Sequence, residues 1–546
     1  MYNNPPHDYL VFWWRGTRVA LIYAESLKSG YEGAFGIVLP PLAAASLASV
    51  ARESGFDVRF FDARANGGLF EDFVGEILDY DPDVAAFIVN ASTLAKPSIE
   101  LTSELKRVSS FVVAGGHHAT FTYPLMLRRG FDVVFLSEGE ISFGEFLKEV
   151  KESGDWRRVK GIAYRDGDSV VVTGLPDLVE SLDDLPMPAF EIFDKEIYKL
   201  RVLDPDGNIV TVETSRGCPY NCEYCSVTKM WGATWRFKSV ERVLAELRRV
   251  LELGYKWVFI VDDNFIVPIK RIIDERVEML RRIISEGLNK LRFLIQLRAD
   301  FVARNEWLPP LLYEAGVRVA FLGIESGDAE TLRNMRKGLQ LSESTKAVKL
   351  LSSNGIIVHG GFMLGAPYED EEAMSKTIKF AVELIEYGLD SAQFSIYTPL
   401  PGTDAFNRAA LNNSLLTLNW DQYDCLTPVM RVKIPPYKLY LKQRWANYYF
   451  FVKKALKAIS KCTLFSKPRT EKDLYLANAT KFVIGKFFKY LKDLTMLPFS
   501  ALKVQLKLRR GLSEEEKRDI LEIIEASKEI MKMHSARLLV TSKTRD

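Results

Sequence analysis

Short apolar runs alternate with amphipathic helical segments in two separate stretches of the chain, and this alternation limits its fold more than any other feature. In the first stretch, up to about residue 180, the expected strands are Thr17–Tyr23, Val58–Phe61, Val84–Val89, Phe111–Ala114 and Val133–Phe135. Helices are expected between them, and the helix over Pro40–Gly55 has proline at its start and glycine at its end. A βαβ series of this kind predicts a doubly wound parallel sheet, with ligands at the carboxyl ends of the strands.

A second series of strands and helices runs from Val210 to about Thr403. Its six expected strands are Val210–Glu213, Trp257–Val261, Arg292–Gln296, Val319–Gly323, Val358–Leu364 and Ser391–Ile396. Six βα units predict a partial parallel (β/α)6 barrel. Between the two series lies Leu185–Ala189, whose two prolines exclude a central strand or helix. After Pro436 the chain is expected to be helical. We therefore expect an α/β protein with domains at 1–190, 205–405 and 406–546.

Three of the five cysteines fall within eight positions, in the segment TSRGCPYNCEYCSV. Cys218, Cys222 and Cys225 form C-x3-C-x2-C directly after the first expected barrel strand, where parallel barrels build their active sites. Thiolates are the usual ligands of iron–sulfur clusters, and three of them leave one iron of a four-iron cube open. The alternatives are unpaired thiols and a structural zinc site. Zinc would need a fourth ligand, and no histidine lies within thirty residues.

The cysteine spacing, with the aromatic Tyr224 just before the third cysteine, resembles the radical S-adenosylmethionine (SAM) superfamily. The resemblance continues through FIVDDNF (259–265), AFLGIESG (320–327), GGFMLGAPYE (360–369) and TPLPGT (398–403). It implies that a [4Fe–4S] cluster on the three cysteines cleaves SAM to a 5′-deoxyadenosyl radical, which removes hydrogen from an unactivated carbon. Such a radical must be shielded from water, and a barrel interior supplies that shield.

The same resemblance implies which residues contact SAM: Tyr224, Asp262, Glu325, Ser326 and Gly361. Asp262 and Glu325 have a plainer alternative, because a carboxylate at the end of a strand often caps the following helix. Gly361 has the alternative of simply allowing close backbone approach.

The amino-terminal domain resembles the Rossmann-like cobalamin (B12)-binding domains that precede some radical SAM barrels. The matching segments are Val38–Asp62, Val112–Thr120, Asp132–Glu140 and Leu185–Ala189, in that order. The resemblance implies cobalamin contacts from Ser92, Thr93, Gly115, Gly116, His118 and Glu138. The D-x-H-x-x-G motif of the wider cobalamin fold is absent, so no ligand for the lower face of cobalt is assigned. His118 has a plain loop histidine as its alternative, and the whole domain has a nucleotide-binding or structural domain as its alternative.

The net charge of +2 hides a strongly basic region near the carboxyl end. Tyr437–Gly511 holds 18 Lys and Arg against 3 Asp and Glu, and aromatic residues mix with lysines at helical spacing in Tyr437–Ser460 and Ala479–Leu494. This pattern favours an interfacial helix on anionic lipid. The alternatives are a helical cap that packs on the barrel and a nucleic-acid surface, which we consider the least favoured.

The sequence therefore predicts a cobalamin-dependent radical SAM enzyme that methylates a hydrophobic, lipid- or isoprenoid-like substrate or forms a carbon–carbon bond or ring in it. The alternatives are a methyltransferase of a soluble natural product and a tetrapyrrole cyclase-like enzyme. A tRNA-modifying enzyme and a cofactor sensor are weaker hypotheses. A reductant such as ferredoxin or flavodoxin is expected. With no recognisable signal peptide or spanning segment, we expect a cytoplasmic protein with peripheral contact to the inner face of the membrane.

Overall fold

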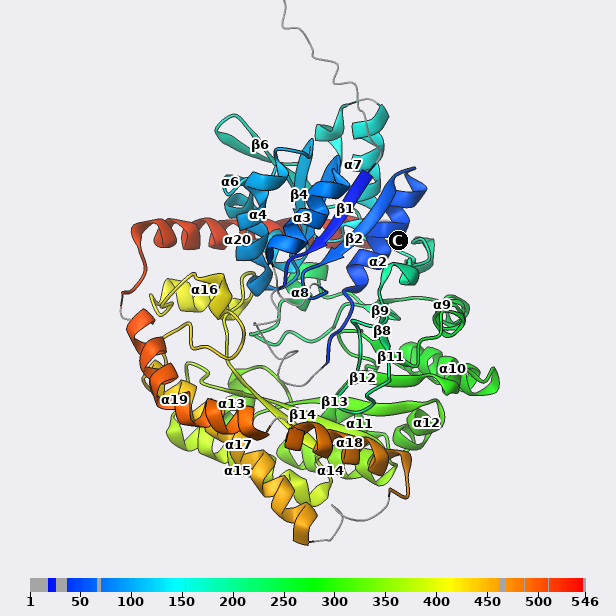
Figure 1. The fold of residues 1–546 in the computed structure, drawn as a ribbon, viewed down its shortest axis with the longest axis vertical. Coiled ribbons are helices and arrows are strands. Elements are labelled where there is room, and N and C mark those ends of the chain that lie inside the picture. Colours follow the sequence, from blue (N-terminus) through cyan, green and yellow to red (C-terminus); the bar gives the residue numbers. More distant parts are fainter. Residues whose placement is uncertain are drawn as a thin grey trace, which may run out of the picture.

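The computed structural model describes residues 18–25, 37–65, 70–152, 154–460, 468–485, 487–508 and 510–543. Two α/β bodies lie one above the other, the amino-terminal one in blue and cyan and the second one in green and yellow (Figure 1). No helix in these ranges is long and apolar enough to cross a membrane. Within the basic segment Ala479–Leu494, the side chains of residues 483, 486–491, 493 and 494 lie outside the described part of the chain.

The amino-terminal body is built on one seven-stranded sheet in the order β2-β1-β3-β4-β5-β6-β7. Its strands are β1 (Arg18–Tyr23), β2 (Asp57–Asp62), β3 (Val84–Ile88), β4 (Phe111–Gly115), β5 (Val133–Phe135), β6 (Ile162–Asp166) and β7 (Ser169–Val172). The first five are parallel, and β6 and β7 form an antiparallel hairpin at one edge. Every residue of β3 is buried, as expected of a strand covered on both faces. The predicted doubly wound sheet is confirmed.

Helices connect these strands. They are α2 (Leu42–Glu53), α3 (Phe70–Tyr80), α4 (Ala95–Leu105), α5 (His117–Phe121), α6 (Tyr123–Arg128) and α7 (Glu140–Glu152), with a short 3-10 turn η1 (Ser92–Leu94) after β3. Of these, α2, α3 and α4 correspond to the helices expected over Pro40–Gly55, Phe73–Tyr80 and Ser98–Val108. The loop that follows β4 is thus a short helix, which the sequence pattern did not indicate.

The second body is a six-stranded parallel sheet in the order β15-β14-β13-β12-β11-β8, which confirms the expected partial barrel. Its strands are β8 (Ile209–Val212), β11 (Trp257–Ile260), β12 (Arg292–Arg298), β13 (Val317–Glu325), β14 (Ile357–Leu364) and β15 (Ser391–Ile396). Fully buried and half-buried residues alternate along β14 and β15, because one face packs on helices and the other faces the barrel interior.

The helices of this body connect its strands, and most of them cover the outer face of the sheet. They are α8 (Val227–Trp231), α9 (Val240–Glu252), α10 (Lys270–Ser285), α11 (Ala299–Arg304), α12 (Leu308–Glu314), α13 (Ala329–Asn334), α14 (Leu341–Ser353), α15 (Glu371–Tyr387) and α16 (Asp404–Leu411). A two-stranded ribbon of β9 (Ser215–Arg216) and β10 (Arg236–Phe237) begins and ends the segment that carries the cysteines.

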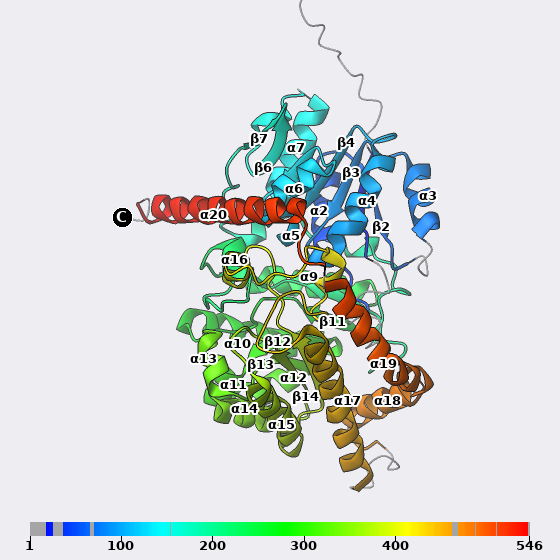
Figure 2. The ribbon, with the colours of Figure 1, turned by 90° about the vertical axis from the view of Figure 1, so that its left-hand side faces the viewer.

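The carboxyl-terminal region is helical, as predicted, and consists of α17 (Pro436–Ser460), α18 (Glu471–Gly485), α19 (Phe487–Leu508) and α20 (Glu514–Lys543). Helix α17 covers the free edge of β15, where Gln443 Nε2 donates to the carbonyl oxygen of Phe394 at 2.6 Å. Helix α18 lies against the amino-terminal ends of the strands, with Tyr475 packed on Trp257 at 5.1 Å between ring centroids. Helix α20 returns to the amino-terminal body and projects from it (Figure 2).

Candidate active site

The three cysteines lie on the loop after the first barrel strand, between β9 and α8. Cys222 is buried and Cys218 and Cys225 are half-buried, and none of them is in a disulfide. The backbone N–H of Cys225 donates to the carbonyl of Cys222 at 3.2 Å, which folds the last two cysteines into one turn. Burial raises the pKa of the Cys225 thiol to about 12 and also raises the pKa of Cys218, with the neighbouring thiols and Asp263 acting in the same direction.

This donor set fits an iron–sulfur cluster better than a single ion. In the part of the chain that the structure describes, no three His, Cys, Asp or Glu side chains converge tightly enough to hold one metal ion. Cysteine binds a metal as the thiolate, so a positively charged group must offset the cost of burying that charge. Three thiols grouped on one loop therefore match a larger, positively charged iron–sulfur core with one position left open.

Asp262 anchors the beginning of the cysteine loop. Its carboxylate, 1% exposed, accepts the backbone N–H groups of Thr214 at 2.6 Å and Ser215 at 3.0 Å, and pairs with Arg276 at 2.7 Å. The alternative role as a helix cap is wrong, because α10 begins after Ile269 with no side-chain cap. The carboxylate is already used by protein donors, and a contact with SAM stays a prediction.

Asp263, the next residue, was not singled out from the sequence and faces the site. Its carboxylate accepts the N–H of Gly217, next to Cys218, at 3.1 Å. Burial raises the pKa of Asp263 to about 7, against the lowering effect of the Gly217 N–H. The doubled aspartate in FIVDDNF was the available signal, but the sequence does not tell which of the two points outward.

Tyr224 and Glu325 meet at the barrel mouth. Burial and the neighbouring Glu325 carboxylate raise the pKa of the Tyr224 hydroxyl well above its ordinary value, and this carboxylate accepts from Lys337 Nζ at 2.7 Å. Glu325 has a left-handed backbone, φ 66°, at a register shift in β13, and this conformation turns its side chain at the end of the strand. It does not cap α13, whose cap is Asp328, so the capping alternative is wrong here too.

Ser326 and Gly361 differ in what surrounds them. The Ser326 hydroxyl is fully buried and bonded to Thr377 Oγ1 at 2.9 Å and to the N–H of Asp328 at 3.1 Å, so it holds the loop after β13 together. A Cβ added at Gly361 would meet only the carbonyl of Leu322, at 3.9 Å. Space is therefore open beside Gly361, on the interior face of β14.

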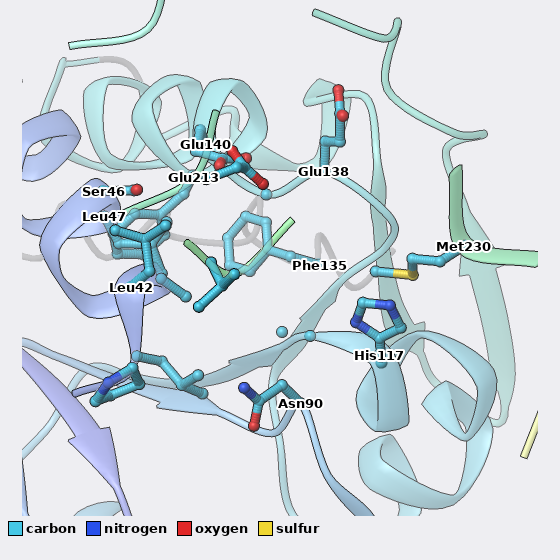
Figure 3. Close-up of a pocket in the computed structure, with 18 of the residues that line it drawn as sticks. Leu42, Ser46, Leu47, Asn90, His117, Phe135, Glu138, Glu140, Glu213 and Met230 are labelled. Carbon is cyan, nitrogen blue, oxygen red and sulfur yellow. The ribbon is translucent and has the colours of Figure 1, made fainter. Parts of the chain in front are cut away.

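A cavity of about 480 Å³ lies between the two bodies (Figure 3). Its amino-terminal side is formed by strand ends and by α2, and is mostly apolar; its other side is formed by Ser215, Arg216, Trp231 and Asp263, beside the cysteine loop. Gly115 and Gly116 lie in its wall. Gly116 has φ 110°, and a Cβ there would be 2.9 Å from the backbone of Val89, so only glycine fits.

Glu138 lines this cavity but is held by arginines. Its carboxylate, 2% exposed, lies 3.3 Å from Arg216 Nη1 and 3.0 Å from Arg236 Nη1, and accepts the N–H of Val179 at 2.9 Å. Burial opposes ionisation, yet Arg236 and Arg216 hold the pKa of Glu138 below its ordinary value. Glu138 therefore joins the two bodies at the edge of the cavity as a carboxylate.

The two neighbouring histidines have different surroundings. His117 lines the cavity, against Trp231 at 5.3 Å between ring centroids, whereas His118 is buried against Trp420 at 4.7 Å and bonded through Nδ1 to Ser92 Oγ at 3.0 Å. Burial lowers the pKa of His117 to about 4 and that of His118 to about 3, so both rings are neutral. The Ser92 hydroxyl is thus used in a hydrogen bond to His118. The residues after β3 and β4 that line the cavity are Asn90 and His117, and neither was singled out from the sequence.

The family follows from comparisons with known proteins. A model of the radical SAM superfamily matches residues 212–381, and a model of the B12-binding domain matches residues 31–147. An uncharacterized methyltransferase of Pyrococcus horikoshii is 34% identical over 422 residues, which cover 76% of this chain and 88% of that protein. The hopanoid C-3 methylase of Methylococcus capsulatus is 29% identical over 73% of each chain.

Two further similarities concern a cyclase and a solved structure. The anaerobic magnesium-protoporphyrin IX monomethyl ester cyclase of Cereibacter sphaeroides is 28% identical over 76% of this chain and 68% of its own length. The cobalamin-dependent SAM radical enzyme OxsB, solved with aqua-cobalamin and SAM bound, superposes with a TM-score of 0.63 at 20% identity, over 96% of this chain and 80% of that one. That likeness shows a shared fold.

The fold and the site thus define an enzyme with a cofactor cavity between a doubly wound domain and a partial barrel. The chain belongs to the radical SAM superfamily, in the group that carries a B12-binding domain before the barrel. It is a radical SAM enzyme of the methyltransferase or cyclase type, and its cofactors are SAM, a [4Fe–4S] cluster and cobalamin.

Proposed function

We propose that this enzyme holds its cluster through Cys218, Cys222 and Cys225, holds cobalamin in the cavity between the two bodies, and modifies an unactivated carbon of a lipid- or isoprenoid-like substrate. The cavity is the main support for placing cobalamin next to the cluster. One of its walls consists of the strand ends of the B12-binding domain, and the other adjoins the cysteine loop. Both cofactors would then serve one substrate.

The chain's own residues would orient the cofactors and enclose the barrel interior. When bound, the cofactors supply a carbon-centred radical and methyl-transfer or redox chemistry. Tyr224, packed edge-on against Tyr397, offers an aromatic face within the cysteine loop. Helix α17 closes the open edge of the barrel at Phe394, and α18 closes its bottom at Trp257. This enclosure keeps water from a reactive carbon centre.

Support for a lipid-like substrate comes partly from α19. Met496, Phe499, Leu502 and Leu506 are 49%, 67%, 57% and 52% exposed, and their spacing of three to four residues places them on one side of the helix. Lys492, Lys503 and Lys507 are exposed along or beside the same side of the helix. Apolar side chains flanked by cations suit an anionic lipid surface, which we propose this α19 face contacts.

The packing interpretation holds for other lysines of the basic region. Lys454 and Lys457 donate to carbonyls of Leu389 and Ile385 at 2.6 and 2.8 Å, and Lys472 pairs with Asp390 at 2.8 Å. These lysines attach α17 and α18 to the barrel. The proposed membrane contact therefore belongs to α19, and it agrees with a cytoplasmic enzyme on the inner membrane face that receives electrons from a ferredoxin or flavodoxin.

Sedimentation of the full chain with vesicles tests the membrane contact. Binding is expected to phosphatidylcholine vesicles that contain phosphatidylglycerol, and it should fall in high salt. The double variant Phe499→Ser/Leu502→Ser should lose most of it, whereas Leu411→Ser, which removes an apolar side chain that is 68% exposed on α16, should not. Absence of binding to anionic vesicles, or equal binding by both variants, would contradict the proposal.

Product analysis tests the substrate. The anaerobically reconstituted enzyme is incubated with reductant, methyl-labelled SAM and a lipid extract of its source cells. Label in a lipid product indicates methylation, and an unlabelled lipid that has lost hydrogen indicates bond or ring formation. A changed product found only among water-soluble compounds would overturn the lipid assignment.

The relatedness to the magnesium-protoporphyrin ester cyclase supports a second candidate, a tetrapyrrole cyclase. The same assay with the magnesium-protoporphyrin ester added distinguishes the two. Conversion of that ester to a product with a new ring would favour the second candidate.

A further inference from the structure

Glu223 lies between two residues of the proposed cofactor site, Cys222 and Tyr224. A glutamate at this place is unexpected, because a carboxylate is costly to bury unless it is paired and hydrogen-bonded. The side chain is only 1% exposed. The surrounding structure must therefore supply donors for it.

Three donors from separate parts of the barrel reach this carboxylate. Its Oε1 accepts from the Tyr368 hydroxyl at 2.9 Å, after β14, and from the Tyr397 hydroxyl at 2.7 Å, after β15. Its Oε2 lies 2.8 Å from Nη2 of Arg408 on α16, as an ion pair without the alignment of a directed hydrogen bond. Burial and the neighbouring Glu223 raise the pKa of both phenols far above the ordinary value, so both remain donors.

The backbone around Glu223 is tied to the same region. Its carbonyl accepts the N–H of Ala405 at 3.1 Å, and its own N–H donates to the carbonyl of Met335 at 3.3 Å. The ring of Tyr397 also packs edge-on against Tyr224, with 6.3 Å between centroids. The loop after the first strand is thus fastened across the barrel mouth to the segments after the last two strands.

The geometry points to Glu223 as a positioning residue that fixes Cys222 and Tyr224 at the barrel mouth and places a paired negative charge beside the cluster. This inference rests on the proposed ligation of the cluster by the same loop. The potential of an iron–sulfur cluster depends on nearby charge and hydrogen bonding. A buried carboxylate disfavours the added electron, and the Arg408 cation offsets part of that effect.

An EPR-monitored redox titration of the reconstituted full chain measures this role, with the cluster signal separated from that of cob(II)alamin by its temperature dependence. Glu223→Gln removes the negative charge and leaves Arg408 unpaired, so the cluster midpoint should shift to a more positive potential. The double variant Glu223→Gln/Arg408→Gln removes both charges and should return the midpoint toward the wild-type value. Glu223→Asp keeps the charge and should lie near the wild type.

Iron content and the spectral change on adding SAM are measured on the same samples. Wild-type protein with full iron content establishes the ligation separately, since a wild type that binds no cluster contradicts the proposed function and not the role of Glu223 alone. Glu223→Gln with full iron content, an unchanged midpoint and an unchanged response to SAM overturns the inference. So does equal cluster loss in the Gln, Asp and double variants, because that pattern is the mark of a purely structural residue.

Discussion

At the scale of single residues, Glu369 is a buried carboxyl group whose environment sets a pH dependence. It is 1% exposed, and its Oε2 accepts the N–H groups of Gly365 and Ala366 at 2.8 and 2.9 Å, whereas Oε1 has no hydrogen-bond partner among the described residues. Burial raises the pKa of Glu369 to about 7 from an ordinary 4.5. The Glu369 carboxyl group keeps its proton to a higher pH in the folded state than in the unfolded state. Its contribution to the free energy of unfolding is therefore full below pH 4.5 and is lost as the pH rises to about 7.

Glu369→Gln should therefore stabilise the protein only at high pH. The amide oxygen still accepts the two N–H groups, and the buried charge is gone. The gain above pH 7 is at most about 3 kcal/mol and falls below about 1 kcal/mol at pH 5. Apparent melting temperatures of variant and wild type at pH 5 and pH 8 measure it. Glu371→Gln, at an exposed position on α15, serves as control. An equal difference at both pH values would contradict the titration of Glu369.

The sequence predicts the position of a site residue along the chain better than it predicts the direction of its side chain. Strand-end position follows from local periodicity, so the cysteine loop and Gly115–Gly116 were expected where they lie. Orientation follows from tertiary contacts. Asp262 and Asp263 are adjacent and alike, yet one bonds Arg276 and the other faces the cavity. His117 and His118 differ in the same way, and no pattern in one sequence separates them.

At the scale of elements, α18 closes the bottom of the barrel through one carboxylate. Glu471 pairs with Arg292 at the start of β12, lies 2.7 Å from Nε of Arg318 in β13, and accepts from the Tyr475 hydroxyl at 2.6 Å. The helical character of this segment was predictable from composition. Its docking was not, because the arginines lie more than a hundred residues away and no local pattern connects them.

Glu471→Gln should loosen α18 from the strand ends. Two arginines, one of them 10% exposed, lose their counter-charge. A loss of about 2 kcal/mol is expected, between the values for surface and buried pairs. The matched control is Glu514→Gln, whose pair with Lys517 is 85% exposed on the glutamate side and contributes little. Thermal unfolding compares the two. Equal melting temperatures would show that α18 does not depend on this carboxylate.

At the scale of the whole molecule, α20 connects the end of the chain to the B12-binding domain. Arg128 on α6 pairs with Asp519 and, at 2.6 Å, with Glu522, and Arg129 pairs with Glu515 at 2.6 Å. Glu516 accepts the N–H of Leu418, in the segment that leads out of the barrel, at 2.9 Å. The helix therefore contacts both bodies where they meet (Figure 2).

Reversal of one charge should release this connection. Arg128→Glu places a carboxylate against Asp519 and Glu522, so α20 should open more often and trypsin should cut at Lys517 and Arg518 about tenfold faster, as expected for ~1.4 kcal/mol of lost local stability. Asp519→Asn/Glu522→Gln in the Arg128→Glu background removes the repulsion without adding a trypsin site and should restore part of the protection. Arg107→Glu, at an exposed pair with Glu104 on α4, should change nothing. Because α20 borders the joint between the bodies, its release should also weaken cobalamin retention during gel filtration. Faster cleavage with unchanged retention would mean that α20 protects the surface without holding the two bodies together.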